Sequence, residues 1–190
     1  GQTQSQPTTR TNSGRLIVLE GVDGVGKSTQ RKLLQAKLES EGLATSYWHF
    51  PQNDSYFGRL IKDYLDGRFG LATAVNPYFA ALLYMLDRFE AAPKIKQALS
   101  EGKIVILDRY ASANFGFQKA KLVSYDERAN FQEWLEKVEY EILANPTEDL
   151  VIFLDINPKL SQKLLADSGK ILDQHDLNGS FLDQAYQSFQ

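Results

Sequence analysis

Residues 21–28 read Gly-Val-Asp-Gly-Val-Gly-Lys-Ser. The spacing fits the pattern G-x-x-x-x-G-K-[ST], in which a glycine-rich turn cradles a chain of phosphates. The flanks support this interpretation, because residues 16–19 are a short apolar run typical of a buried strand. Leu33, Leu34 and Leu38 then recur at helical spacing. A chance glycine-rich turn is the alternative, and the flanking strand and helix argue against it.

Each residue type in this loop has a chemical reason to be there. Gly21 and Gly26 let the backbone curl close to an anion, which backbone N–H groups at the following helix N-terminus can bind. Lys27 is expected to reach toward the outer phosphates, and the Ser28 hydroxyl to ligate Mg²⁺. The predicted phosphate-contacting residues are Gly21, Val22, Asp23, Gly24, Val25, Gly26, Lys27, Ser28 and Thr29.

The composition is that of an ordinary globular protein. The chain has 190 residues, of which 43% are hydrophobic and 24% charged, with a net charge of -3 and no cysteine. Because basic residues are not in excess, we expect no nucleic-acid partner. Because the chain has no cysteine, disulfides and thiolate chemistry are excluded. No apolar run approaches the ~20 residues of a membrane-spanning helix, so we expect no membrane partner and a cytoplasmic location. Residues 1–14 are predicted to be a disordered tail, with an expression leftover or a short transit peptide as alternatives.

Apolar strands alternate with helical segments through the rest of the chain. Four strands are predicted at residues 15–20, 44–50, 103–107 and 150–154. Helices are predicted from the loop to about residue 41, then at residues 57–65, 76–92, 93–102 and 124–145, with two more after residue 157. This alternation predicts one α/β domain over residues 15–190, in which a parallel sheet carries helices on both faces.

Two of the predicted helices carry specific signals. Pro93 is expected to break the apolar helix that begins at Asn76-Pro77 and to start the next one. Residues 124–127 read Ser-Tyr-Asp-Glu, a capping-box pattern that should open an amphipathic helix. The apolar side of that helix is predicted to carry Phe131, Leu135, Val138 and Ile142.

Polar residues follow the predicted strands at their carboxyl ends, where ligands bind in parallel sheets. We therefore expect Asp23, residues 50–51, residues 108–110 and Asp155 to converge on one cleft. A carboxylate such as that of Asp108 can hold Mg²⁺ through water, and a neighbouring arginine can grip phosphate. An Asp-Arg pair that merely caps the strand is the alternative.

With these segments in order, the sequence resembles the thymidylate kinase family, whose members transfer the γ-phosphate of ATP to dTMP. The matching segments are residues 20–29, 50–51, 87–90 and 108–110, followed by Asn114 and Gln118. Their order and separations agree with the family from about Arg15 to the end of the chain. The resemblance implies a three-layer P-loop NTPase fold, ATP as donor, Mg²⁺ as cofactor and dTMP as acceptor. It also implies a homodimer packed through the helix around residues 79–86.

The resemblance implies roles for individual side chains. Lys27, Arg109 and Asp108 would be the catalytic residues, with Ser28 and Asp108 at the metal. Asp23 would contact the sugar 3′-hydroxyl. Tyr84 would stack on thymine, with a purely structural place in the core as the alternative. Gln118 would line the base pocket, or be a solvated loop residue. The full set of implied dTMP contacts is Asp23, Phe50, Pro51, Tyr84, Arg88, Arg109, Asn114 and Gln118. No general base is assigned, because the acceptor phosphate is already a nucleophile.

Three departures from the family pattern stand out. The lid expected at about residues 160–172 contains no arginine, and Lys163 and Lys170 are assigned a transition-state role there, with solvated helix lysines as the alternative. Gln52 and Asn53 stand where many members place an arginine on the acceptor phosphate. No strand is predicted after Asp155, so either the chain is truncated or its sheet has four strands and an open adenine site.

Two other functions remain open from the sequence. One is a kinase for a related deoxynucleotide or a deoxynucleoside. A nucleoside kinase would use a carboxylate base near Phe50, where Asp54 is the candidate; no glutamate is present there, which argues against this function. The other is a P-loop nucleotide-binding module with little catalysis, given the arginine-free lid.

Overall fold

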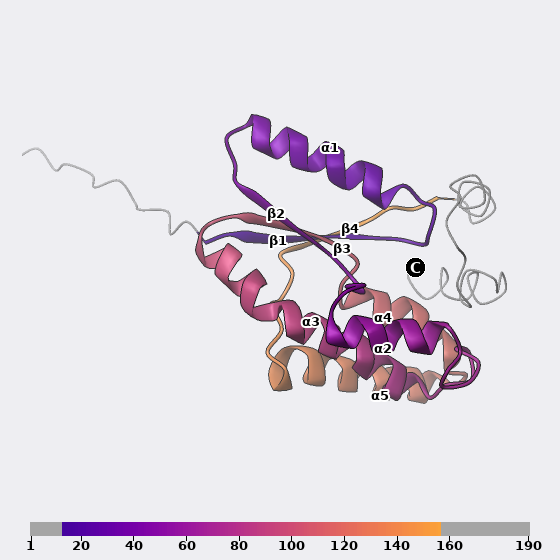
Figure 1. Cartoon of the computed structure of the whole chain (residues 1–190). Coiled ribbons are helices and arrows are strands. Elements are labelled where there is room, and N and C mark those ends of the chain that lie inside the picture. Colours follow the sequence, from indigo (N-terminus) through magenta and orange to yellow (C-terminus); the bar gives the residue numbers. More distant parts are fainter. Residues whose placement is uncertain (1–12, 157–190) are drawn as a thin grey trace, which may run out of the picture.

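Four parallel strands form the centre of the molecule. The computed structural model describes residues 13–156, apart from the side chains of Phe115, Phe117 and Ala120. The sheet has the order β2-β3-β1-β4, with every neighbouring pair parallel (Figure 1). Its strands are β1 (Arg15–Glu20), β2 (Thr45–His49), β3 (Ile104–Asp108) and β4 (Leu150–Phe153). The predicted strands are confirmed to within two residues at each end.

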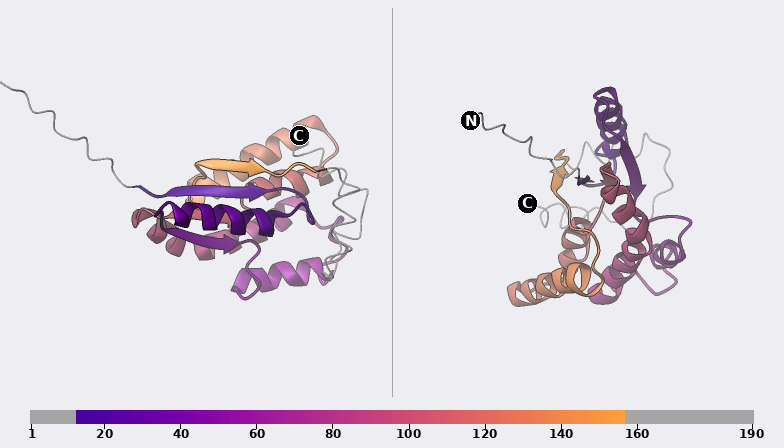
Figure 2. Two further views of the ribbon diagram at one scale, coloured as in Figure 1. Left: turned by 90° about the horizontal axis from the view of Figure 1, so that it is seen from above. Right: turned by 90° about the vertical axis from the view of Figure 1, so that its left-hand side faces the viewer.

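Helices cover both faces of this sheet, as predicted. Helix α1 (Lys27–Ser40) lies on one face, and the remaining helices lie on the other (Figures 1 and 2). Those helices are α2 (Tyr56–Leu65), α3 (Pro77–Ser100), α4 (Ser112–Phe117), the 3₁₀ helix η1 (Lys119–Lys121), α5 (Tyr125–Glu136) and the π-helix η2 (Lys137–Ile142). None of the helices within residues 13–156 is long and apolar enough to cross a membrane.

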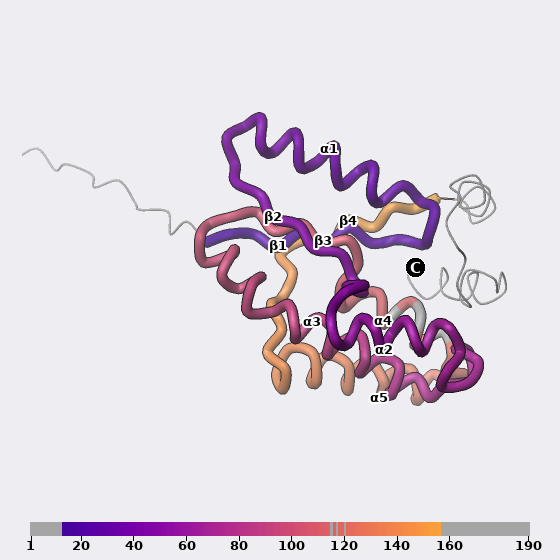
Figure 3. The backbone as a smooth tube through the Cα atoms, in the orientation of Figure 1, coloured from indigo at the N-terminus to yellow at the C-terminus, as the bar shows by residue number. Residues whose placement is uncertain are grey.

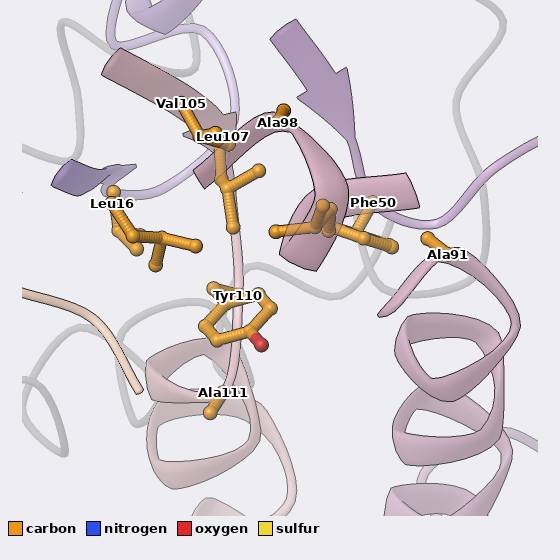
Figure 4. Close-up of a cluster of buried hydrophobic side chains, with 10 residues drawn as sticks. Leu16, Phe50, Ala91, Ala98, Val105, Leu107, Tyr110 and Ala111 are labelled. Atoms are coloured by element: carbon orange, nitrogen blue, oxygen red, sulfur yellow. The ribbon is translucent and has the colours of Figure 1, made fainter. Parts of the chain in front are cut away.

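The main core lies between the sheet and α3. Leu16, Val105 and Leu107 point from the strands toward Tyr110 and toward Ala98 of α3 (Figure 4). Since β1 and β3 pair directly, with Leu16 opposite Val105, their apolar side chains form one continuous surface. Both central strands are therefore held rigidly, and so are the polar residues that follow their carboxyl ends.

Pro93 does not break the helix, which corrects the sequence prediction. Helix α3 runs unbroken from Pro77 to Ser100 with Pro93 inside it (Figure 3). A proline in a helix interior leaves the carbonyl four residues earlier without its usual donor. Here that residue is Phe89, whose side chain is 47% exposed, so water can reach the turn. On the opposite side Ala91 and Ile95 are buried in the core on either side of the proline, and this packing keeps the helix continuous.

The capping box at residues 124–127 is confirmed, but the helix it opens changes character. Ser124 Oγ accepts from Glu127 N at 3.1 Å, and the Glu127 carboxylate accepts from Ser124 N at 3.1 Å. After Glu136 the chain widens into η2. This extra turn rotates later residues away from an α-helical register, so Ile142 is 64% exposed, contrary to the prediction, whereas Glu139 is buried.

Gly14, which was predicted to belong to the tail, is hydrogen-bonded to the rest of the domain. Gly14 N donates to Leu99 O at 2.8 Å, and a Cβ at Gly14 would lie 2.3 Å from Lys103 O. Gly14 therefore belongs to the folded domain. The two helices predicted after residue 157 lie outside the described residues.

Candidate active site

The polar residues that follow β1 and β3 meet at one edge of the sheet. Leu19 pairs with Asp108 across the two strands, and Arg109 N donates to Leu19 O at 3.0 Å. Phe50 N donates to Asp108 O at 3.0 Å, which brings the end of β2 to the same place. Asp155 follows β4 at this edge and is exposed. The site is therefore assembled at the carboxyl ends of the strands, as the sequence predicted.

The phosphate loop has an open, glycine-lined interior. Gly21 and Gly26 have φ angles of 140° and 94°, a region that glycine adopts without strain. A Cβ at Gly21 would lie 2.8 Å from Leu154 O, whereas one at Gly26 would meet nothing within 4 Å. Gly26 precedes α1 and provides no side-chain cap for its first N–H groups, which suits an incoming anion. In the same loop Val22 is buried, Gly24 and Val25 are half-buried, and Ser28 and Thr29 are exposed.

The Lys27 ammonium is folded back onto its own loop. Its Nζ donates to Gly21 O at 2.9 Å and to Val22 O at 3.1 Å, and it lies 3.5 Å from Asp23 Oδ1. Burial lowers the Lys27 pKa, and the charge of Arg109 acts in the same direction.

Arg109 lies between two carboxylates. Its Nη2 donates to Asp23 Oδ1 at 2.5 Å, and its Nη1 lies 3.6 Å from Glu20 Oε1. Its backbone has φ 66°, which is uncommon outside glycine and turns the side chain back toward the phosphate loop. Burial acts to lower the Arg109 pKa, but the negative charges of Asp23 and Glu20 raise it overall, so the guanidinium is a permanent cation.

Asp108 offers an oxygen that fits a metal ion. Its Oδ1 is buried and finds no hydrogen-bond partner among residues 13–156. Its Oδ2 lies 3.6 Å from His49 Nδ1. Burial tends to raise the Asp108 pKa, but the contact with His49 and the charge of Lys27 lower it overall, so the carboxylate is ionised. The described residues contain no group of three His, Cys, Asp or Glu side chains that could hold a metal. Mg²⁺ requires no such cage when phosphate oxygens and water complete its coordination.

Arg88 lies in the interior and is held by a carboxylate. It is 1% exposed, and its Nε and Nη2 donate to the two Glu139 carboxylate oxygens at 2.7 and 2.6 Å. Its Nη1 donates to Tyr110 O at 3.4 Å. Burial opposes the charged form, but Glu139 raises the Arg88 pKa. Glu139 uses Nε and one N–H of Nη2, so any contact with a nucleotide would have to use Nη1 or the second N–H of Nη2.

The other predicted pocket residues line the same side of the sheet as Arg88. Tyr84 is half-buried and packs edge-on against Tyr64, with ring centroids 6.5 Å apart. Phe50 is buried against Tyr110, with ring centroids 5.9 Å apart, and Pro51 follows it at the end of β2. Asn114 Nδ2 donates to Ala81 O at 3.4 Å. Gln118 is buried, and its Oε1 has no hydrogen-bond partner in the described part of the chain.

Sequence reasoning missed several polar residues that support the site. Asp87 accepts from Ser55 Oγ at 2.6 Å and from Gln52 N at 2.9 Å, and so fixes the turn after Pro51 against α3. Gln52, at the position where many family members have an arginine, therefore stabilises this turn through its hydrogen bonds to Asp87. The carboxylates of Glu20 and Glu139 were not assigned roles either. Two signals were available for Glu20: it ends an apolar strand, and it begins the matching segment at residues 20–29. Lys163 and Lys170 lie outside the described residues.

Comparison with known proteins gives one consistent result. The model of the thymidylate kinase family matches residues 19–188. Thymidylate kinase from Schizosaccharomyces pombe is 35% identical over 150 residues, which cover 79% of this chain and 65% of the relative. The human thymidylate kinase is 33% identical over 180 residues, covering 93% of this chain and 75% of the relative.

A solved structure agrees with these relatives. The thymidylate kinase of Candida albicans superposes with a TM-score of 0.73 at 27% identity, covering 93% of this chain and 76% of that one. The chain spans just under two thirds of the length of the Schizosaccharomyces pombe relative. The phosphate loop, the paired Asp23 and Arg109 and strands β2, β3 and β4 all belong to the segment that the family model matches. The chain therefore belongs to the thymidylate kinase family.

Proposed function

We propose that this protein transfers the γ-phosphate of ATP to dTMP, giving ADP and dTDP. The observation that carries the proposal is the meeting of Lys27, Asp23 and Arg109 at the carboxyl edge of the sheet. Two cations beside an open phosphate loop suit a reaction between two phosphate groups. Family membership supports the same donor and acceptor.

The reaction asks mainly for positioning and positive charge. An oxygen of the dTMP phosphate attacks the γ-phosphorus in line, a new P–O bond forms, and the bond to the β-phosphate oxygen breaks to release ADP. Lys27 and Arg109 neutralise charge on the transferring group, and because both side chains are largely buried these interactions are stronger than in water. Arg109 must exchange its Asp23 contact for the acceptor phosphate, which frees Asp23 for the sugar 3′-hydroxyl. No general base is needed.

Mg²⁺ is part of this proposal, with Ser28 and Asp108 as the residues that would hold it. The buried Asp108 Oδ1 and the exposed Ser28 hydroxyl at the start of α1 are oxygen donors of the kind that Mg²⁺ prefers. The bound ion would supply positive charge to the phosphate oxygens.

The acceptor pocket extends from the phosphate site toward α3 and α4. We propose Tyr84 as the stacking surface for thymine. Gln118, whose buried Oε1 has no hydrogen-bond partner among residues 13–156, is proposed as a polar contact to the base or sugar. The remaining proposed pocket residues are Phe50, Pro51, Arg88 and Asn114. Homodimer formation and a cytoplasmic location also belong to the proposal.

The test is ADP production from ATP and Mg²⁺ with dTMP, dUMP, dCMP, dGMP, dAMP or thymidine as acceptor. The thymidylate kinase of Candida albicans has broad substrate specificity, so a range of acceptors is needed. We expect turnover with dTMP that exceeds turnover with dUMP. Lys27→Ala should reduce it by at least 100-fold, because a phosphate-binding cation that acts in the transition state is lost.

Each other outcome points to a different function. Turnover with thymidine but not dTMP would indicate a nucleoside kinase. ATP binding without turnover on any acceptor would indicate a nucleotide-binding module and contradict the proposal.

A further inference from the structure

Glu20 is a buried carboxyl side chain for which the proposed reaction has no task. Burial raises the Glu20 pKa, whereas the charge of Arg109 and the hydrogen bond from Ser112 act to lower it. Glu20 is the last residue of β1, 1% exposed, in a strand that pairs with β3 on one side and β4 on the other. Burying an ionised carboxylate costs free energy unless several donors surround it. Such a residue at the edge where the site is assembled therefore needs an explanation.

The Glu20 carboxylate joins three separate parts of the site. Its Oε1 accepts from Gly21 N at 3.2 Å and lies 3.6 Å from Arg109 Nη1. Its Oε2 accepts from Ser112 Oγ at 2.8 Å. One side chain thus contacts the first residue of the phosphate loop, the arginine that follows β3 and the first turn of α4.

The two carboxylates that face Arg109 differ in position. Asp23 is part of the open phosphate loop and half-exposed, whereas Glu20 lies beneath it in the sheet. A phosphate that binds Arg109 from the cleft has to displace Asp23 but does not compete for the position of Glu20. Glu20 can therefore hold the guanidinium both before and after the acceptor binds.

We propose that Glu20 is a positioning residue for the acceptor phosphate, which it orients through Arg109. The inference rests on the proposed function and deepens it. Without the Glu20 charge, Asp23 would hold Arg109 more strongly, and the guanidinium would lose the support that aims it into the cleft. Both effects weaken the contact with an incoming phosphate, whereas in the nucleoside part of the pocket only the proposed Asp23 contact with the 3′-hydroxyl is affected.

The experiment measures the phosphate contribution to binding, as the ratio of the dissociation constant of thymidine to that of dTMP. We compare the wild type with Glu20→Gln, which keeps the shape of the side chain and removes its charge. The ratio should fall about tenfold, because dTMP binding weakens much more than thymidine binding, as for loss of a charge-assisted hydrogen bond. Ser112→Ala, which removes one hydrogen bond and keeps the charge, should reduce the ratio by about threefold.

Two further proteins separate positioning from general damage. Asp149→Asn makes the same chemical change at the opposite end of β1, where Asp149 accepts from Leu16 N at 2.8 Å, and should leave the ratio unchanged. In an Arg109→Met background Glu20→Gln should have no further effect on the ratio, because Glu20 acts through Arg109.

The contrary results are equally distinct. An unchanged ratio, an equal loss of thymidine and dTMP affinity, or the same fall in the Arg109→Met background would overturn the role of Glu20. If the wild type binds dTMP no better than thymidine, the proposed function itself fails, and the inference with it. Circular dichroism of each variant establishes that the protein compared is folded.

Discussion

Lys121 is a half-buried cation that connects two distant segments. Its Nζ donates to Tyr64 Oη at 2.8 Å and to Ala72 O at 2.6 Å, and lies 5.2 Å from the centroid of the Tyr64 ring. Burial lowers the pKa of Lys121 to about 8. None of the described contacts of Lys121 is with a carboxylate, so burial of the ammonium costs free energy that no ion pair offsets.

This lowered pKa predicts a pH dependence of stability. In the unfolded chain the lysine titrates near 10.5, so between pH 8 and pH 10 the unfolded state binds more protons than the folded state. The free energy of unfolding should therefore rise with pH in this window, by about 1–2 kcal/mol more for the wild type than for Lys121→Met, after allowance for solvent screening. Urea unfolding at pH 8, 9 and 10 measures the difference.

A matched variant isolates the effect of Lys121. Lys119→Met removes a lysine from the same 3₁₀ turn, where it bonds to Gln132, and should follow the wild-type dependence. Burial also raises the pKa of Tyr110 and Tyr140, which opposes stability above pH 10 but does so in all three proteins. Parallel curves for wild type and Lys121→Met would show that the ammonium is solvated.

The π-helix η2 is the element that determines where Arg88 points. Its wide turn directs Glu139 inward, where the carboxylate binds Arg88 and also accepts from Asn145 Nδ2 at 2.8 Å. Glu141, two residues on, is exposed. The buried pair ties η2 to α3 and, through Tyr110 O, to the chain that follows β3.

Removing the Glu139 charge should destabilise the protein. Glu139→Gln leaves the Arg88 guanidinium buried without its counter-ion, at a cost of about 3 kcal/mol in the free energy of unfolding. Chemical denaturation measures it. Glu141→Gln, the same change on the exposed side of the turn, should change stability by less than about 0.5 kcal/mol. Equal effects of the two substitutions would contradict the importance of the buried pair.

How far these elements follow from the sequence depends on which interactions fix them. The strands and the capping box at Ser124 depend on local pattern and were predicted well. The proximity of Asp23 and Arg109 could also be predicted from the sequence, because the carboxyl ends of parallel strands meet at one edge of the sheet. The pairing of Arg88 with Glu139 could not be predicted, because the π turn changes which residues of the helix face inward and the sequence carries no local signal for such a turn. Pro93 was misjudged for a similar reason, since packing on both sides of it overrides its own preference.

At the level of the whole molecule, helix α3 has both a buried and an exposed side. Ala80, Ala81 and Met85 are buried, whereas Phe79 and Phe89 are 43% and 47% exposed. Phe79, Leu82, Leu86 and Phe89 recur at helical spacing along one stripe, with the two leucines half-buried. The Phe79 ring also packs against that of Phe69, with centroids 5.7 Å apart. Exposed aromatic rings on a long helix are suited to pack against a second copy of the chain.

The proposed homodimer can be tested by placing charge on this stripe. A carboxylate at an apolar interface would lose its water without gaining a partner, so Phe79→Glu and Phe89→Glu should each shift the protein from dimer to monomer in sedimentation velocity. Leu33→Glu is the control, because Leu33 is 60% exposed on α1, across the sheet from α3, and this variant should remain a dimer (Figure 1). A wild-type protein that sediments as a monomer, or a dimer that survives both α3 substitutions, would show that α3 is not the contact. If the wild type is a monomer, the active site has to be complete within a single copy.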